Sequence, residues 1–346
     1  MHIVDLRSDT MTQPTESMRH AMADAEVGDD VFGEDPSINR IEKIAAERMN
    51  KEAALYVTSG TMANIVSLMA HCQRGDEMIV GDQAHIFNAE QGGSAALGGI
   101  HPHTLPNTVD GRIDLDHIVD AIRPDDAHFP RTRLIVLENT HNHCNGSPLD
   151  VDYMQSVGNI ARKYNLKIHV DGARIFNAAI ALGVETSELV APVDSVSFCL
   201  SKGLAAPVGS LLCGTNEFIA RARRARKVLG GGMRQAGVLA AAGIVALTEM
   251  VDRLAQDHAN ARNLAQGLSE INGILIDPAR MVTNIVFFEM EHPKKTPADF
   301  VERLEAEGVK ILQEGPHKYR AVTHYHVTTD DIGFALDRFK KVLSKR

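Results

Sequence analysis

The 346-residue sequence lacks several features that would mark a specialised class of protein. No run approaches the ~18 consecutive apolar residues that a membrane-spanning helix needs, and the first residues lack the charged-then-apolar pattern of a secretory signal. We therefore expect a cytoplasmic protein with no membrane partner. The formal net charge of -9 argues against nucleic acid as a partner, because phosphate binding requires a basic surface.

Metal-binding and nucleotide-binding motifs are also missing. The four cysteines are dispersed and form no CxxC pair, so the sequence predicts neither a disulfide framework nor a cysteine metal site. The pairs His101/His103 and His141/His143 have a spacing that a metal could use on a strand, but no acid or cysteine set stands beside them and we expect no metal site. No GxGxxG motif follows an expected strand, which argues against a dinucleotide-binding fold.

What the chain does contain is a regular alternation of short apolar strands and helices between residues 53 and 214. This pattern is typical of an α/β domain with a mostly parallel sheet and helices on both faces. From about Asn272 the pattern changes to a small α+β arrangement. The expected division is an N-terminal arm with helices (residues 1–50), a large α/β domain (51–255) and a small C-terminal α+β domain (256–346).

Four finer expectations accompany this division. Residues 88–97 are predicted as one glycine- and alanine-rich helix, and residues 319–327 as a strand. Thr296 and Pro297 are predicted to begin a helix. The helix that opens at Gln235 is apolar nearly all round, which indicates a buried helix at a subunit contact or between domains.

Two residues suited to chemistry follow neighbouring strands. Asp171 ends the strand 167–171, and Lys202 lies in a turn just after the strand 195–200. A helix connects these strands, so they should lie side by side and parallel, with carboxyl ends at the edge where open α/β sheets bind ligands. A lysine there can form a Schiff base, and an acid can hold a pyridinium nitrogen protonated, as in pyridoxal phosphate chemistry. Alternatively, Asp171 caps the helix near Arg174 and Lys202 is a solvated turn residue.

Further polar groups are expected at the same edge. Ser59, Gly60 and Thr61 open a helix directly after a strand, and the backbone N–H groups of such a turn suit a phosphate. The same tripeptide is also an ordinary helix cap. His85 follows another strand end and should lie at the same edge as Asp171. The basic run at 221–227 fits a solvated helix face.

Four strings of sequence, taken together and in order, carry a resemblance to a known family. They are VDLRSDTMTQPT, HVDGARIFNA, CLSKGLAAPVGS and GGGMRQAG. The chain closely resembles the low-specificity L-threonine aldolases, within the β-eliminating lyase group of pyridoxal-phosphate enzymes, from Asp5 to the VTH near residue 323. The resemblance implies a fold-type-I large domain like that of aspartate aminotransferase. It also implies a homo-oligomer, expected as a dimer of dimers, whose sites lie between chains.

The resemblance implies a cofactor, a reaction and a set of residues. The cofactor is pyridoxal 5'-phosphate, and the reaction is aldol cleavage of L-threonine or L-allo-threonine to glycine and acetaldehyde through an external aldimine. Lys202 would carry the cofactor, Asp171 would pair with its ring nitrogen and His85 would stack on its ring. The implied cofactor-binding residues are Lys202, Asp171, Gly60, Thr61, His85, Arg174, Lys227 and Arg234, the last two from the same or a neighbouring subunit.

Ser8, Arg174 and Arg320 match the family positions that hold the substrate carboxylate. The arginine fork suits this role because it binds a carboxylate through two hydrogen bonds. Read without the family, Arg174 could form a salt bridge to Asp171, three residues away, and Arg320 could be a surface strand residue. His85, His128, or a water held by either, are the candidates for the base that takes the β-hydroxyl proton.

Two departures from the family pattern leave the diastereomer preference open. Phe32 stands where relatives often have tyrosine, and Asn88 and Ala89 stand where many carry an aromatic residue. Two other functions also remain open. One is a β-eliminating lyase that releases ammonia and a keto acid, and the other is a non-catalytic pyridoxal-phosphate-binding protein. The latter would have no need of a carboxylate clamp made by Arg174 and Arg320.

Overall fold

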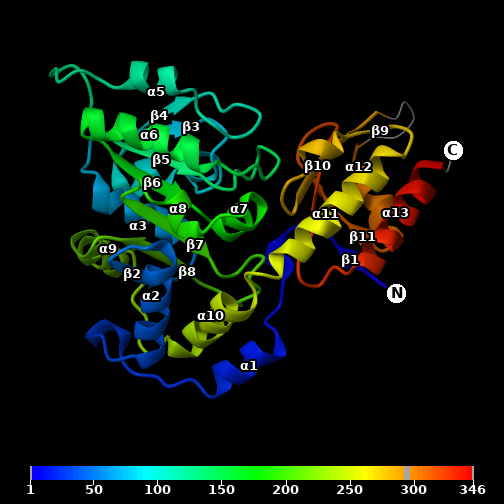
Figure 1. Cartoon of the computed structure of the whole chain (residues 1–346), viewed down its shortest axis with the longest axis horizontal. Helices are drawn as coiled ribbons and strands as arrows, with labels where there is room; N and C mark the ends of the chain where they lie inside the picture. Colours follow the sequence, from blue (N-terminus) through cyan, green and yellow to red (C-terminus); the bar gives the residue numbers. More distant parts are fainter. Residues whose placement is uncertain (1, 292–296, 345–346) are drawn as a thin grey trace.

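The largest sheet in the computed structural model lies in the middle of the chain (Figure 1). The structure describes residues 2–291 and 297–344, and within them this sheet has seven strands in the order β2-β8-β7-β6-β5-β3-β4. Its strands are β2 (Ala53–Val57), β3 (Glu77–Gly81), β4 (His101–Leu105), β5 (Thr132–Glu138), β6 (Lys167–Asp171), β7 (Ser195–Cys199) and β8 (Ser210–Gly214). The strands from β7 to β4 are parallel, and β8 is antiparallel to both neighbours. The predicted mostly parallel α/β sheet is confirmed.

Helices cover both faces of this sheet, which is why its strands are short apolar runs. In β5, Ile135 and Leu137 belong to the core on one face, whereas Leu134 and Val136 belong to a separate cluster on the other face. Helices α6 and α7 pack on the first face and α3 on the second. The helices of this part are α3 (Gly60–His71), α4 (His85–Asn88), α5 (Leu115–Ala121), α6 (Val151–Tyr164), α7 (Ile175–Leu182), α8 (Thr186–Leu189) and α9 (Asn216–Val228).

The C-terminal part forms a second, antiparallel sheet in the order β12-β13-β10-β9. Its elements are α11 (Leu254–Ser269), β9 (Ile274–Leu275), β10 (Ile285–Met290), α12 (Pro297–Ala306), β11 (Val309–Lys310), β12 (Leu312–Gln313), β13 (Lys318–Val322) and α13 (Thr329–Ser344). This agrees with the small α+β arrangement expected after Asn272. The exact boundaries drawn after residues 50 and 255 stay a prediction.

The N-terminal segment links the two parts. Strand β1 (Val4–Asp5) pairs in parallel with β11, and Val4 and Leu6 join the C-terminal hydrophobic cluster. The chain then runs to α1 (Glu16–Ala23) and α2 (Pro36–Met49), both of which pack against α10 (Gly237–Glu249). Figure 1 shows this blue segment crossing from the C-terminal part to the region beneath the large sheet. Residues 5–15 are thereby carried past the carboxyl edge of the large sheet.

Some expected elements differ from the structure. Residues 88–97 do not form one helix, because Gln91 and Gly92 adopt positive φ angles of 54° and 64° that interrupt it. The strand expected over 319–327 ends at Val322. Helix α12 begins at Pro297 as predicted, while Thr296 lies outside the described residues. The apolar helix α10 packs against α1 and α2 of its own chain.

No helix in residues 2–291 and 297–344 is both long enough and apolar enough to cross a membrane.

Candidate active site

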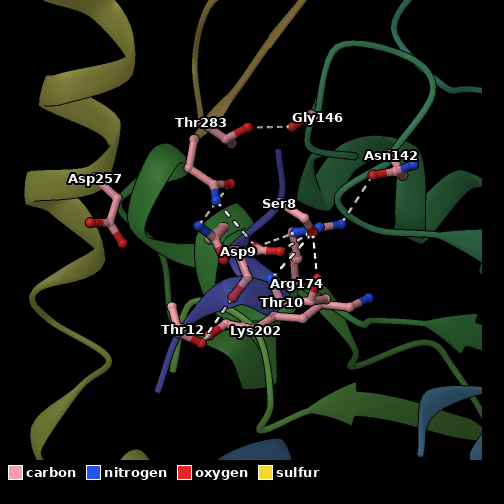
Figure 2. A network of polar contacts seen from close by, with 12 residues as sticks. Ser8, Asp9, Thr10, Thr12, Asn142, Gly146, Arg174, Lys202, Asp257 and Thr283 are labelled. Atoms are coloured by element: carbon pink, nitrogen blue, oxygen red, sulfur yellow. Dashed lines mark hydrogen bonds and ion pairs between the residues drawn. The ribbon is translucent and has the colours of Figure 1, made fainter. Parts of the chain in front are cut away.

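Asp171 and Lys202 lie at the same edge of the large sheet. Strands β6 and β7 are parallel neighbours with Asp171 opposite Ser197, and Lys202 follows three residues after the end of β7. The predicted parallel pairing of these two strands is therefore confirmed. The Lys202 backbone carbonyl accepts a hydrogen bond of 2.9 Å from the Thr12 hydroxyl, and its side chain is half-buried. Figure 2 shows Lys202 beside Arg174 and the N-terminal segment that crosses this edge.

Asp171 is buried and held by hydrogen bonds. Its Oδ2 accepts from the Asn64 side chain at 2.9 Å, and its Oδ1 accepts from the Ala173 backbone N–H at 3.1 Å. The same Asn64 amide donates to Glu90 Oε1 at 2.9 Å, so one side chain links two carboxylates. Asp171 does not cap α7, because the N-cap position of that helix is Arg174. Its carboxylate instead faces helix α3, on which Asn64 lies.

His85 is held between two acids at this edge. Its backbone N–H donates to Glu138 Oε2 at 2.7 Å, and its ring Nδ1 lies 3.1 Å from Glu90 Oε1. The hydrogen bond to Glu90 raises the pKa of His85 above its ordinary value of 6.5, despite the opposing effect of desolvation. Burial in turn raises the pKa of the Glu90 carboxyl. With Nδ1 committed to Glu90, Nε2 is the ring nitrogen left to meet a ligand.

The ligand-type atoms of His85, Glu90 and Asp171 lie within 4.8 Å of one another. That separation is close enough to hold a metal ion, at a place where the sequence indicated none. The His85–Glu90 hydrogen bond and the amide of Asn64 already connect the three side chains. The grouping is therefore already a hydrogen-bonded network, in which Oε2 of Glu90 is buried without a hydrogen-bond partner.

Arg174 forms a buried ion pair with Asp9. Its Nε and Nη2 donate to the two carboxylate oxygens of Asp9, both at 2.7 Å (Figure 2). Burial is the largest single effect and opposes ionisation of Asp9. The charge and hydrogen bonds of Arg174, together with the Lys202 charge and the Asn284 hydrogen bond, outweigh it and hold the pKa of this carboxyl well below its ordinary range. The salt bridge to Asp171 considered from the sequence is not formed, since the fork of Arg174 is occupied by Asp9. Its Nη1 remains, 3.2 Å from Asn142 Oδ1.

Arg320 comes from β13 of the C-terminal part to the same place. Its Nη1 lies 3.3 Å from Asn142 Oδ1 and 3.1 Å from Glu314 Oε1, and its buried Nε has no hydrogen-bond partner. Arg320 is therefore not a surface strand residue. Burial lowers the pKa of Arg320, and the positive charge of Arg174 adds to this effect. Two guanidinium groups thus converge on one amide oxygen, an arrangement suited to a carboxylate ligand.

Ser8 completes this cluster. Its hydroxyl oxygen accepts from the Thr10 backbone N–H at 3.2 Å and lies 2.9 Å from the Thr10 hydroxyl, which donates to it. Figure 2 shows Ser8 next to Arg174. Ser8 therefore lies in the N-terminal segment that crosses the candidate site.

Gly60 and Thr61 begin helix α3, as the sequence predicts. The Ser59 hydroxyl caps this helix by accepting from the Met62 backbone N–H at 3.1 Å. A side chain at Gly60 would place its Cβ 2.9 Å from Cys199 Sγ, so the close approach of α3 to β7 requires glycine here. The positive end of a 12-residue helix therefore points at the carboxyl edge of the sheet, where it suits a phosphate.

Lys227 and Arg234 flank the glycine run at residues 230–232. Within one chain they do not reach the start of α3 at Gly60 and Thr61. Both are exposed, and Arg234 pairs with Asp29 at 2.9 Å. In the described part of the chain, neither side chain has a hydrogen bond to Gly60 or Thr61. The glycine run itself does approach α3, because a Cβ at Gly231 would lie too close to the Sδ atom of Met62.

The basic run 221–227 is only partly a solvated helix face. Arg226 is buried, and its guanidinium donates to Asp30 Oδ2 and to the Tyr56 carbonyl oxygen, both at 2.7 Å. This residue ties the N-terminal arm to α9. Arg221 and Arg224 remain exposed.

His128 is not brought to the site within one chain. It lies between α5 and β5, before the amino end of that strand, whereas Glu138 at the carboxyl end of β5 belongs to the site. Its side chain is 88% exposed and its ring Nδ1 contacts Asp126 at 2.7 Å. Only a neighbouring subunit could bring such a residue to the carboxyl edge.

The structure also reveals site residues that the sequence reasoning did not assign. They are Asp9, Asn64, Glu90, Glu138, Asn142 and Glu314. Glu138 ends β5 and Asn142 follows it, so their place at the end of a buried strand was an available signal. Asn64 is a polar residue in the middle of an apolar helix, and this position is a weaker signal. The local sequence gave no signal for Asp9 or for Glu314. The partner of Asp9, Arg174, is distant in the sequence, and the partner of Glu314, Arg320, lies in the strand β13.

The residues at this edge fit pyridoxal phosphate by the chemistry of their side chains and backbone. Lys202 supplies an amine, Asp171 a buried acid, and the first turn of α3 supplies backbone N–H groups at the positive end of the helix. The paired arginines supply a place for the carboxylate of an amino acid. The fold and the site together define an α/β domain with a candidate ligand site at the carboxyl edge of its sheet.

Comparison with known proteins identifies the family. Residues 5–291 match the β-eliminating lyase family model. Low-specificity L-threonine aldolase 1 of Arabidopsis thaliana is 48% identical, over 99% of this chain and 97% of the relative. The low specificity L-threonine aldolase of Escherichia coli K12 is 45% identical, over 99% of this chain and all of the relative. The chain belongs to the β-eliminating lyase family.

Solved structures show the same fold. A threonine aldolase from Leishmania major superimposes with a TM-score of 0.83 at 17% identity, covering 98% of this chain and 99% of that one. A serine palmitoyltransferase from Sphingomonas wittichii gives a TM-score of 0.78 at 18% identity, covering 98% and 87%. These likenesses confirm the expected fold-type-I architecture.

Proposed function

We propose that this protein cleaves L-threonine and L-allo-threonine to glycine and acetaldehyde with the help of pyridoxal 5'-phosphate. Relatives with 45% to 49% identity over nearly the full chain are described as low-specificity L-threonine aldolases or probable ones. One observation carries the proposal to this chain. Arg174 and Arg320 converge at the sheet edge that also carries Lys202 and Asp171, so an amino-acid carboxylate and a Schiff-base lysine would meet there.

The cofactor would be held by residues from three strand ends and one helix. Lys202 would bind it through its amine, Asp171 would face its ring nitrogen, and Gly60 and Thr61 would bind its phosphate. Once bound, pyridoxal phosphate supplies an electron sink that stabilises negative charge at the α-carbon of an amino acid. The Asn64 hydrogen bond supports the role of Asp171, because it keeps the carboxylate oriented while leaving it unpaired with any cation among the described residues.

The substrate carboxylate would be bound by Arg320, by Nη1 of Arg174 and by the hydroxyl of Ser8. Fixing the carboxylate orients the α-carbon and so determines which of its bonds is aligned for cleavage. Arg174 would contribute through one nitrogen, since Asp9 occupies the other two. Arg320 is then the better candidate for a two-point contact, because its buried Nε has no partner in the free protein.

His85 would accept the proton of the substrate β-hydroxyl. As this proton moves to His85, the oxygen forms the carbonyl of acetaldehyde and the electron pair of the Cα–Cβ bond would stay at the α-carbon. Acetaldehyde leaves, and the α-carbon would then take up one proton to give glycine, whose carboxylate remains bound. Glu90 supports this role because its hydrogen bond at Nδ1 leaves Nε2 as the basic nitrogen and stabilises the protonated ring. His128, or a water held by either histidine, is the other route, and His128 would act only across a subunit boundary.

A homo-oligomer, expected as a dimer of dimers, is part of the same proposal. The side chains of Phe32 and Val228 are 74% and 73% exposed, which is unusual for large apolar residues in water. They lie beside Arg234 and Lys227, the two residues predicted to bind the phosphate from the same or a neighbouring subunit. A reducing, cytoplasmic location is also proposed, and the four free, buried cysteines are consistent with it.

The first test is to incubate the purified protein and pyridoxal phosphate with L-threonine and, separately, L-allo-threonine. Acetaldehyde and glycine in equal amounts would support aldol cleavage. Ammonia and a keto acid without acetaldehyde would instead support β-elimination. Bound cofactor with no product from either substrate would favour a non-catalytic binding role.

The second test is the Lys202→Ala variant. We expect it to lose both turnover and the coloured absorption of the bound cofactor, because no other group can replace the Schiff-base amine. Lys167→Ala is the matched control, since Lys167 lies at the opposite end of β6 in an exposed pair with Asp194. A fully active Lys202→Ala protein would rule out the mechanism.

A further inference from the structure

Each arginine of the carboxylate site has an acidic partner within the protein, but the two partners are held very differently. Asp9 is fully buried and joined to Arg174 by two hydrogen bonds of 2.7 Å. Glu314 contacts Arg320 through one pair of atoms 3.1 Å apart, and its side chain is 20% exposed. The first pair is a fixed part of the structure, whereas the second can open.

The local structure allows Glu314 to move without moving Arg320. Strands β12 and β13 form a short antiparallel hairpin in which Leu312 is opposite Arg320, and Glu314 lies in the turn between them. The Glu314 backbone N–H donates to the Lys318 carbonyl oxygen at 2.9 Å, which holds the turn. Arg320 itself lies in β13 between two hydrogen-bonded strands, opposite Phe287. A change in the Glu314 side-chain rotamer is therefore enough to break the ion pair, while the contacts of the Arg320 guanidinium with Asn142 and with the Arg7 carbonyl oxygen keep it in place.

The charges at this site favour displacement by a ligand. With Asp9 paired to Arg174 and Glu314 paired to Arg320, each guanidinium in the free protein is already balanced by a carboxylate of the protein. Glu314 contacts Nη1 of Arg320, Nη2 has only a long contact of 3.5 Å with the Arg7 carbonyl oxygen, and Nε is buried without a hydrogen-bond partner. A substrate carboxylate that binds the fork through two nitrogens makes a better contact than the single one it replaces.

We propose that Glu314 is an internal competitor for the carboxylate of the substrate. In the free protein it occupies Arg320, and it is displaced when an amino acid with an α-carboxylate binds. This inference rests on the proposed function, which supplies the class of ligand. Its consequence is that only the fraction of molecules with the pair open can bind, so the apparent affinity is weakened by that fraction.

The test compares wild-type protein with Glu314→Gln, both loaded with pyridoxal phosphate. We expect the KM for L-threonine and the dissociation constant of glycine, measured by calorimetry, to fall about threefold to tenfold, the range set by a partly exposed ion pair that must open first. The kcat should not change, because Glu314 does not contact the reacting atoms. An unchanged KM and dissociation constant would overturn the proposal. An increase in both would also overturn it, because it would mean that Glu314 positions Arg320.

Two controls separate this effect from a general loss of negative charge. Glu305→Gln makes the same charge change in a partly exposed pair with Lys310 in the same part of the chain, and it should leave both constants unchanged. An amino alcohol that lacks the carboxylate should bind the wild type and Glu314→Gln equally. A gain for the amino alcohol, or an equal gain in Glu305→Gln, would contradict the proposal. Wild-type turnover tests the proposed function separately, and the glycine titration decides the role of Glu314 even if no threonine is cleaved.

Discussion

Replacement of Asp9 by asparagine removes the negative charge from the buried pair at the centre of the candidate site. The side chain keeps its size, but the Arg174 guanidinium loses the charge that compensates its burial. The asparagine oxygen can still accept one of the two guanidinium hydrogen bonds. Its amide group, however, would face the remaining N–H of Arg174 or the Asn284 side chain, which donates to Asp9 at 3.2 Å.

The expected cost follows from this geometry. Removing one partner of a buried ion pair typically destabilises a protein by about 3 to 5 kcal/mol, because the other charge stays buried and unpaired. Since one hydrogen bond to Arg174 survives, we expect Asp9→Asn to lower the free energy of unfolding by about 3 kcal/mol. The effect on substrate binding should be comparable in size. A guanidinium displaced by about 1 Å can cost a factor of up to roughly 100 in kcat/KM.

The assay is urea unfolding at neutral pH, followed by steady-state kinetics with L-threonine. Asp5→Asn is the matched control, because Asp5 pairs with Arg7 in the same N-terminal segment but both side chains are partly exposed. That variant should lose less than about 1 kcal/mol. If Asp9→Asn also lost less than about 1 kcal/mol and kept its KM, the buried pair would not be the structural support inferred here.

Two pH-dependent predictions follow from histidines near the site. Glu90→Gln removes the acceptor charge that raises the pKa of His85, so the acid limb of the kcat/KM profile should move to lower pH, and an unmoved limb would contradict the role of Glu90. Burial lowers the pKa of His169 from 6.5 to about 4, so between these values the unfolded chain binds a proton that the folded chain excludes. The unfolding free energy should therefore fall by about 2 kcal/mol from about pH 7 to about pH 5, and a His169→Asn protein with the same acid sensitivity would refute this contribution.

The sequence predicted the edge of the sheet on which the site lies because that prediction depends on local order. A strand, a helix and a second strand connect Asp171 to the turn of Lys202, and the handedness of such connections leaves little choice of arrangement. The start of α3 at Gly60 was predicted for a similar reason, since a small-residue turn after a strand has its own local chemistry.

The arginine contacts were not predictable in the same way. Arg174 and Asp171 are three residues apart, yet Asp171 faces Asn64 on helix α3, and Arg174 at the start of α7 contacts Asp9. Asp9 is 165 residues away in the sequence. It reaches Arg174 because β1 pairs with β11 and directs the N-terminal segment across the sheet edge. Nothing in the local sequence specifies that pairing.

By itself, the sequence determined the elements and chemistry that depend on near neighbours. These include the alternating strands and helices, the acid and the amine at adjacent strand ends, and the four strings that carry the family resemblance. Only the tertiary structure decided which charges neutralise one another: Asp9 with Arg174, Glu90 with His85 and Glu314 with Arg320. The physical reason is that Coulomb energies and desolvation depend on distance and burial in three dimensions, and neither quantity is encoded in the spacing of residues along the chain.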